Sequence, residues 1–131
     1  MEAGKQFKKR NAILACLRQT DRHPSAEMVH EMLRAEHPDI SLATVYRNLS
    51  LFKSQGEIIS VSTVRGVERF DARTAPHTHF LCMSCDAITD LPEVEVPETL
   101  YKSAESHSGG QIDGCSLTFT GLCAECQNKN N

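Results

Sequence analysis

The 131-residue sequence lacks any apolar run long enough to cross a bilayer, and it contains no recognisable signal peptide. These absences predict a cytoplasmic protein with no membrane partner, in a reducing compartment where cysteines remain thiols. The six cysteines are therefore expected to bind metal rather than to form disulfides. No internal repeat is present apart from two paired cysteine motifs. The length suits one ordinary domain or two small ones.

The sequence also lacks a strong excess of either charge, because its formal net charge is −3. The distribution is more informative than the total. Residues 1–71 contain 11 Lys or Arg against 9 Asp or Glu, whereas residues 72–131 contain 3 against 8. The first part is therefore weakly basic and the second acidic, which favours a polyanion as a partner of the first part alone. The basic excess is small, so charge alone is weak evidence for a polyanionic partner.

Hydrophobic periodicity predicts three helices in the first part. They are residues 10–19, a segment that opens at His23-Pro24 and ends before Pro38, and a segment from Ser41 to Gly56. Two β-prone runs follow, residues 57–63 and 67–70, and Arg65-Gly66 between them is typical of a hairpin turn. Three helices and a hairpin predict a winged helix-turn-helix domain over residues 1–71, which would place its third helix in the DNA major groove.

The third predicted helix has two distinct faces. At about 100° per residue, one arc collects Leu42, Val45, Leu49 and Phe52 as the expected buried stripe. The opposite face is expected to contact DNA through Ala43, Thr44, Tyr46 and Arg47. An amphipathic core helix with a merely solvated outer face is the alternative. Leu51 also falls on the outer face, and neither interpretation explains it.

Residues 72–76 are expected to form a hinge before a second domain over residues 77–131. This domain is predicted to contain strands at 78–83 and 87–91, a helix at 97–106 and a strand at 115–120, with a disordered tail after Gln127. Alternation in the last strand places Cys115, Leu117 and Phe119 on its buried face. Cys16 is likewise expected to be a small core residue. So short a domain buries little core alone, and zinc and self-association would both relieve that shortage.

The two Cys-x-x-Cys pairs predict a structural zinc site formed by Cys82, Cys85, Cys123 and Cys126. A thioredoxin-like redox pair is the alternative, but a second matching pair would then be a coincidence. A zinc deaminase would require a His-x-Glu triplet upstream, and the sequence has none.

His77 and His79 precede the first cysteine pair at a spacing that places both on one side of a strand. Two surface histidines at a strand edge are the alternative to a metal site. Asp71 precedes them by six residues across the linker, and Asp90 ends the neighbouring predicted strand. Imidazoles with carboxylates suit iron(II), manganese(II) or zinc, so a second metal site is expected here.

Three segments of the sequence carry a resemblance to a known family: Ser41-Leu42-Ala43-Thr44-Val45-Tyr46-Arg47-Asn48-Leu49, Arg69-Phe70-Asp71, and His77-Thr78-His79-Phe80-Leu81-Cys82-Met83-Ser84-Cys85. In this order they resemble the ferric uptake regulator (Fur) family of bacterial metal-dependent repressors. The resemblance extends from about Arg10 to Cys126.

The resemblance implies a transcriptional repressor rather than an enzyme, acting as a homodimer on a pseudo-palindromic operator in double-stranded DNA. It implies an α+β fold, with an N-terminal winged helix-turn-helix and a C-terminal α/β dimerisation domain that holds the four-cysteine zinc site. It also implies a regulatory Fe²⁺ or Mn²⁺ ion between the domains, ligated by His23, Asp71, His77, His79 and Asp90.

The last of these ligands helps to separate branches of the family. Asp90 resembles the peroxide-sensing branch (PerR), whereas iron-sensing members tend to have glutamate there. Peroxide sensing would make His23 and His77 sensitive to oxidation. A further metal site of Fur proteins is expected to be absent, because Thr78 and Cys115 stand at its positions.

The N-terminal segment departs from the family pattern. The usual first helix is expected to be missing, and Phe7-Lys8-Lys9-Arg10 replaces a Thr-x-Gln-Arg-like approach to the next helix. Lys5, Lys8 and Lys9 are nonetheless expected to reach a DNA phosphate or the minor groove. Two rival functions stay open: a repressor that responds to iron or zinc availability alone, and a thiol or metal enzyme.

Overall fold

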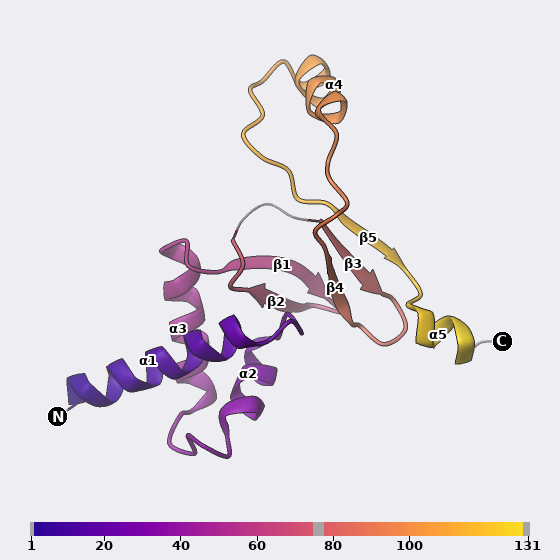
Figure 1. Ribbon diagram of the computed structural model, residues 1–131. Helices are drawn as coiled ribbons and strands as arrows, with labels where there is room; N and C mark the ends of the chain where they lie inside the picture. Colours follow the sequence, from indigo (N-terminus) through magenta and orange to yellow (C-terminus); the bar gives the residue numbers. More distant parts are fainter. Residues whose placement is uncertain (1, 75–77, 130–131) are drawn as a thin grey trace. The chain divides into compact units, whose positions relative to one another are not determined.

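Helices precede the hairpin in the first part of the chain, in the order that the sequence predicts. The computed structural model describes residues 2–74 and 78–129 and divides into two units, Met1–Thr74 and Ala75–Asn131 (Figure 1). The first unit contains three helices, α1 (Glu2–Gln19), α2 (Ala26–Leu33) and α3 (Leu42–Ser54), and an antiparallel pair of strands, β1 (Ile59–Val64) and β2 (Val67–Asp71). This is the winged helix-turn-helix.

Two helix starts differ from the expectation. The predicted opening of the second helix at His23-Pro24 is wrong, because His23 has φ 53° and the Ser25 side chain caps α2 by accepting from the Met28 amide at 3.2 Å. The first helix begins at Glu2 rather than at Arg10. Residues 2–9 carry no apolar stripe, but Lys, Gln and Ala are good helix formers and extend the helix. The segment Phe7–Arg10 therefore belongs to α1.

The third helix matches its prediction closely. Ser41 accepts from the Thr44 amide at 3.1 Å as the N-cap, and Gly56 follows the helix with φ 77°. Val45, Leu49 and Phe52 are buried, and Leu42 is half-buried. Leu51 is also half-buried, because it lines a groove of about 440 Å³ between α1 and α3.

One hydrophobic cluster forms the core of the first unit. Its buried members among the described residues come from all three helices and the segments that follow them: Ile13, Leu17, Ala26, Val29, Leu33, Ile40, Val45, Leu49, Phe52, Ile58 and Phe70. The hairpin turn is as predicted, with Arg65 at φ 52° and Gly66 at φ 82°. Positive φ at both positions fits the tight turn that matches the twist of the paired strands.

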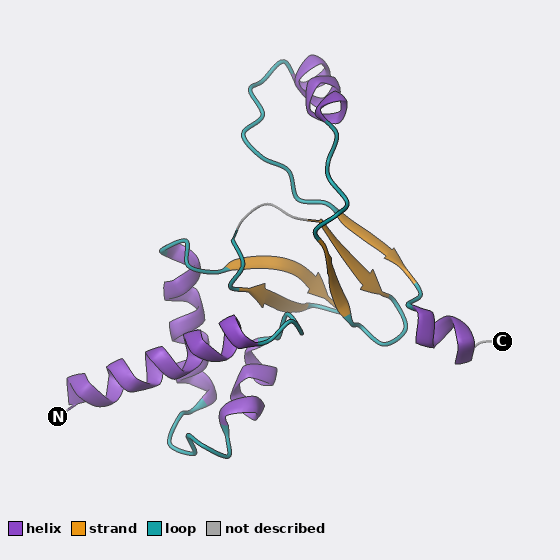
Figure 2. Cartoon of the chain, in the orientation of Figure 1, coloured by secondary structure: helices purple, strands orange, loops and turns teal. Residues whose placement is uncertain are grey.

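The second unit contains a three-stranded sheet in the order β4-β3-β5 (Figure 2). Strands β3 (Thr78–Cys82) and β4 (Ile88–Leu91) are antiparallel, and β5 (Thr118–Gly121) runs parallel to β3. Helix α4 (Glu98–Ser108) lies in the connection before β5 and ends at Gly109, with φ 71°. Helix α5 (Ala124–Lys129) closes the unit, so the prediction of a disordered tail after Gln127 is wrong up to Lys129.

The last strand also differs from its prediction. It begins at Thr118 instead of Cys115, and Cys115 is exposed rather than buried in a core. Phe119, expected on the buried face, is 44% exposed. Among the described residues, strand β5 pairs with β3 on one side only, and none of its side chains is fully buried.

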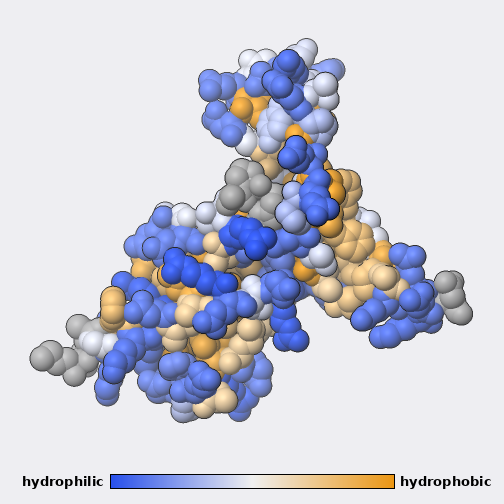
Figure 3. Space-filling model, in the orientation of Figure 1, coloured by the Kyte–Doolittle hydropathy of each residue, from blue (hydrophilic) through white to orange (hydrophobic). Residues whose placement is uncertain are grey.

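Burial in the second unit is sparse. Its buried hydrophobic residues, among those described, are Leu81, Cys82, Ile88 and Cys126, and α4 buries none of its described side chains. Figure 3 shows hydrophobic residues at the surface over the strands of this unit. Among residues 2–74 and 78–129, no helix combines the length and apolar character that crossing a bilayer requires.

Candidate metal centres and nucleic-acid interface

Strand pairing brings the two Cys-x-x-Cys motifs together. Cys82 ends β3 and pairs alongside Gly121 of the parallel β5, so the turn after each strand lies at the same end of the sheet. The sulfurs of Cys82, Cys85, Cys123 and Cys126 all lie within 4.8 Å of one another. The Sγ atoms of Cys85 and Cys123 are 3.9 Å apart. Sulfurs at the corners of a tetrahedron are about 3.8 Å apart when each lies about 2.3 Å from a zinc ion, so the quartet fits this metal.

Backbone amides favour the ionised form of one of these thiols. The N–H groups of Cys123 and Cys85 donate to the Cys82 sulfur at 3.4 and 3.5 Å. These hydrogen bonds lower the pKa of Cys82 to about 6. A thiolate is the form that binds metal, so the fold prepares Cys82 as a ligand.

In the first unit, a histidine and an aspartate from distant parts of the chain come together. His23 Nε2 lies 3.2 Å from Asp71 Oδ2, and both residues are buried. The backbone of His23 has a left-handed conformation that is uncommon for a residue with a side chain. Surrounding structure must therefore hold it in place.

Arg69 and Phe70 of β2 provide that support. The buried Arg69 guanidinium donates to the carbonyl of His23 and, at 2.9 Å, to the carbonyl of Arg22. The Phe70 amide donates to the Pro24 carbonyl at 3.0 Å. These bonds tie the segment before α2 to the strand that ends in Asp71. They fix the spacing between His23 and Asp71.

In the second unit, strand register builds a similar pair. His79 of β3 lies directly opposite Asp90 of β4, and His79 Nε2 is 3.2 Å from Asp90 Oδ1. The histidine is 3% exposed. The neighbouring Thr78 side chain instead donates to the carbonyls of Leu91 and Val94 at 2.8 and 2.9 Å. His77, which the sequence places beside His79 as a ligand, lies outside the described residues.

Each unit therefore presents one imidazole with one carboxylate. This donor set suits a borderline first-row ion, namely manganese(II), iron(II) or zinc. Sequence spacing alone could not have identified Arg69 as the residue that supports the first pair, because it acts on carbonyls 46 and 47 positions away.

The residues predicted to contact DNA lie on one side of α3. Tyr46 is 47% exposed, and Ala43 and Arg47 are exposed. The Arg47 guanidinium donates to Thr44 Oγ1 at 3.3 Å, and the Ser41 hydroxyl also donates to Thr44 Oγ1, at 3.0 Å. The N-cap thus helps to orient Arg47, although Thr44 itself is half-buried.

Helix α1 adds positive charge beside this face. Lys5 and Lys8 are exposed on α1, and Lys9 lies 3.8 Å from Asp39. The groove between α1 and α3 is lined by cationic and amide side chains together with Leu51, including Lys9, Arg10 and Arg47. Arg10 was not among the residues predicted to contact DNA, because its place in this groove depends on how α1 packs beside α3.

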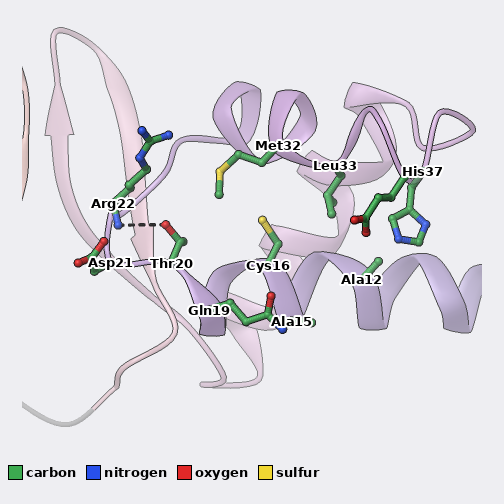
Figure 4. Close-up of a pocket in the computed structure, with 11 residues that line it drawn as sticks. Ala12, Ala15, Cys16, Gln19, Thr20, Asp21, Arg22, Met32, Leu33 and His37 are labelled. Carbon is green, nitrogen blue, oxygen red and sulfur yellow. Dashed lines mark hydrogen bonds between the residues drawn. The ribbon is translucent and has the colours of Figure 1, made fainter.

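A second hollow, of about 580 Å³, lies between α1 and α2 (Figure 4). Cys16 and Met32 both point into it, and the Arg22 amide donates to Thr20 Oγ1 at 3.2 Å at one end. Burial raises the pKa of Cys16. Cys16 is half-buried and packs against the hydrophobic cluster of the first unit.

Comparison with known proteins gives one family. The family model described as "Ferric uptake regulator family" matches residues 3–120. The peroxide-responsive repressor PerR of Staphylococcus aureus (strain USA300) is 32% identical over 120 residues, which cover 92% of this chain and 80% of the relative.

Solved structures agree with this result. The Campylobacter jejuni peroxide stress regulator is similar over 93% of this chain and 91% of its own, with a TM-score of 0.77 and 26% identity. A ferric uptake regulator from Francisella tularensis, determined with iron, covers 90% of each chain with a TM-score of 0.76 and 27% identity. These relatives are regulators rather than enzymes.

Proposed function

The chain belongs to the ferric uptake regulator family of metal-responsive regulators, and we propose that it is a metal-dependent transcriptional repressor that senses peroxide. In this proposal it acts in the cytoplasm as a homodimer on a pseudo-palindromic DNA operator. The observation that carries it is the pair of buried His–Asp contacts, one in each unit, in a chain with this family's fold.

The winged helix would supply the DNA contacts. Tyr46 and Arg47 of α3 would contact base edges, with Ala43 and Thr44 beside them. Lys5, Lys8 and Lys9 of α1 would bind phosphates, which position the protein without reading sequence. Arginine to guanine is the commonest specific contact in the major groove. Replacing Arg47 with alanine should therefore relax sequence preference, whereas replacing Lys8 should weaken binding to all sequences about equally.

The second unit would form the dimer. Strand β5 pairs on one side only within residues 2–74 and 78–129, and Phe119 on it is 44% exposed. Leu100 of α4 is 46% exposed on a helix that buries none of its described side chains. A second copy of the chain would cover this apolar surface, and a C2 dimer would match the symmetry of a pseudo-palindromic operator.

Two metal ions have distinct roles in this proposal. Zinc held by Cys82, Cys85, Cys123 and Cys126 would join the ends of β3 and β5 and stabilise the second unit. A regulatory Fe²⁺ or Mn²⁺ ion would be held by His23, Asp71, His77, His79 and Asp90. Only six residues separate Asp71 from Thr78, so the connection spans at most about 25 Å, a length that would allow one ion to engage both His–Asp pairs.

A shared ion explains how metal would control DNA binding. Each monomer presents one recognition helix, and the two must be separated by the distance between adjacent major-groove half-sites. Without the ion, the two units of a monomer would sample several arrangements, and ordering them on DNA would reduce affinity. With it, His23 and Asp71 of the winged helix would be tied to His79 and Asp90 of the other unit.

Peroxide sensing is supported by Asp90 and by the similarity to two peroxide regulators. An iron(II) ion at this site would supply the redox chemistry that activates hydrogen peroxide. In the net reaction, one peroxide oxygen is added to the imidazole ring of His23 or His77, and the other leaves as water. The modified ring is a poorer ligand, so the winged helix is released and the operator is vacated.

A DNA-shift titration with iron(II), manganese(II) and zinc, each with and without hydrogen peroxide, tests this function. We expect metal-dependent binding in which only the iron-loaded protein loses affinity after peroxide treatment. Mass spectrometry of that sample should show one added oxygen atom on His23 or His77. Oxygen added only to methionine or cysteine would contradict peroxide sensing.

The similarity to the iron-bound Francisella regulator favours a second candidate, a repressor that responds to metal availability alone. That candidate predicts the same metal dependence with no effect of low peroxide.

A further inference from the structure

A carboxylate on α2 engages the exposed tyrosine of α3. The Tyr46 hydroxyl donates a hydrogen bond to Oε1 of Glu27, which lies in the first turn of α2. The two residues are 19 positions apart in the sequence, and both are exposed. The contact therefore joins the two helices of the helix-turn-helix at its surface, beside the side chains expected to meet DNA.

This contact decides which way the tyrosine hydrogen points. A phenol has one hydrogen to donate and also accepts, whereas an ionised carboxylate only accepts. The hydrogen must therefore lie between Tyr46 and Glu27. The pKa of Glu27 is lowered by its hydrogen bond with Tyr46, and the pKa of Tyr46 is raised by the same bond. At neutral pH the carboxylate stays ionised and the phenol protonated, so the direction of the bond does not change.

Because the hydroxyl hydrogen points to Glu27, the solvent-facing side of the Tyr46 oxygen can only accept a hydrogen bond. In the major groove, adenine N6 and cytosine N4 are donors, whereas guanine O6 and N7, thymine O4 and adenine N7 are acceptors, so guanine and thymine present no donor there. An acceptor facing the groove pairs with the amino groups and opposes the acceptor edges. The orientation of a single hydrogen thus distinguishes two classes of base.

We propose that Glu27 is a specificity-determining residue, which makes the Tyr46 hydroxyl an acceptor and so selects an adenine or cytosine amino group at the base that Tyr46 meets. This inference rests on the proposed function, because it requires α3 to enter the major groove. Glu27 itself touches no base and acts through Tyr46.

Two simpler roles for Glu27 make different predictions. If the carboxylate only repelled nearby phosphates, its removal would raise affinity for all sequences by a similar factor. If it only held α2 against α3, its removal would lower thermal stability without changing base preference. A change of preference at one position of each half-site is expected only from the proposed role.

Glutamine is the informative replacement. Its amide can donate to the Tyr46 oxygen through the nitrogen or accept from the phenol through the oxygen, so the direction of the hydrogen bond is no longer fixed. The hydroxyl can then present either its hydrogen or a lone pair to the groove. Tyr46→Phe removes the polar group and keeps the ring. Glu31→Gln is the matched control, because Glu31 is an exposed acid on the same helix that is bonded to Arg34 rather than to α3.

The test is selection of randomised DNA by the full zinc- and manganese-loaded protein and by the three variants, with thermal unfolding measured for each. Wild type and Glu31→Gln should prefer adenine or cytosine at one position of each half-site. Tyr46→Phe should lose roughly tenfold discrimination there. Glu27→Gln should lose most of the preference for adenine or cytosine at that position, with other positions unchanged.

The outcomes separate this inference from the proposed function. Wild-type preference retained by Glu27→Gln, or by Tyr46→Phe, would overturn the inference and leave a sequence-specific repressor. A uniform change of affinity across sequences in Glu27→Gln would overturn it as well. Absence of sequence-specific binding by the wild-type protein with every metal would overturn the proposed function and the inference together.

Discussion

The two units of this chain are stabilised in different ways. The first has a continuous hydrophobic core drawn from three helices and the hairpin, whereas the second buries few apolar side chains and has a helix with none buried among its described residues. Burial of apolar surface is the main favourable term in folding. The first unit can therefore depend on its own core. The second depends on its cysteine quartet and, in our proposal, on a partner.

The units resemble each other in one respect. Each buries a histidine against an aspartate, His23 with Asp71 and His79 with Asp90. Buried polar groups are expensive unless they are hydrogen-bonded or bind a metal. In our proposal, the hydrophobic core stabilises the first unit and the cysteine quartet stabilises the second. The two His–Asp pairs respond to the regulatory signal.

Removing zinc should have the largest effect, because metal binding to a quartet of this kind contributes on the order of 10 kcal/mol to folding. We expect a strong chelator under reducing conditions to unfold residues 78–129 and to leave residues 2–74 folded. Hydrogen exchange read by mass spectrometry measures both regions at once. Cys126→Ser should reproduce the effect, whereas Cys115→Ser, at an exposed cysteine outside the quartet, should retain one zinc ion per chain. An equal loss of hydrogen-exchange protection in both regions would contradict the expectation that only the second unit depends on zinc.

A cavity in the core of the first unit should destabilise that unit and leave the second unit folded. Phe52 is 1% exposed, and replacing it with alanine should lower the free energy of unfolding of the first unit by about 3–5 kcal/mol. Denaturant titration followed by circular dichroism measures the change. Phe7, 61% exposed on α1, is the control, and Phe7→Ala should have almost no effect. If Phe52→Ala also loses its bound zinc, the two units do not fold independently.

Arg69→Lys should impair the His–Asp pair of the first unit alone. Lysine keeps the charge but lacks the planar guanidinium that reaches the carbonyls of both Arg22 and His23. Loss of a residue that supports a metal ligand weakens metal affinity about 10- to 100-fold. Manganese(II) titration of the zinc-loaded protein is the measurement, with the exposed Arg18→Lys as control. Unchanged affinity would mean that Arg69 supports only the fold.

The smallest expected effect concerns surface charge. Lys53 lies 2.7 Å from Glu68, and its hydrogen bond lowers the pKa of Glu68. Lys53→Gln should lower stability at pH 7 by less than about 1 kcal/mol. Since the pKa is lowered in the folded state, this difference is present above the ordinary glutamate pKa and disappears as pH falls through the lowered value. Lys102→Gln, at an exposed pair on α4, should change nothing measurable.

Sequence predicted the parts of this molecule that local rules govern. The N-cap at Ser41, the Arg65-Gly66 turn and the buried face of α3 depend on residues close together in the chain, and all three are confirmed. The convergence of the cysteine quartet followed from the spacing of two repeated motifs.

The errors arose where tertiary structure overrode local signals. Pro24 precedes a helix, as its fixed φ allows, but hydrogen bonds from β2 hold His23-Pro24 outside it. Periodicity placed Phe119 inside, yet its side chain is 44% exposed on a strand whose described residues are at most half-buried. The Tyr46–Glu27 contact depends on how α2 crosses α3, which no sequence spacing encodes.

One ion shared by the two His–Asp pairs is central to the proposed mechanism, and a double-mutant cycle on manganese(II) affinity tests it most directly. Calorimetric titration of the zinc-loaded wild type should show one regulatory ion per chain. His23→Ala and His79→Ala should each weaken that binding strongly, and the loss of affinity in the double variant should be smaller than the sum of the two single losses, because both remove ligands from the same ion. Two independent sites, each lost in one single variant while the other persists with wild-type affinity, would contradict the shared ion.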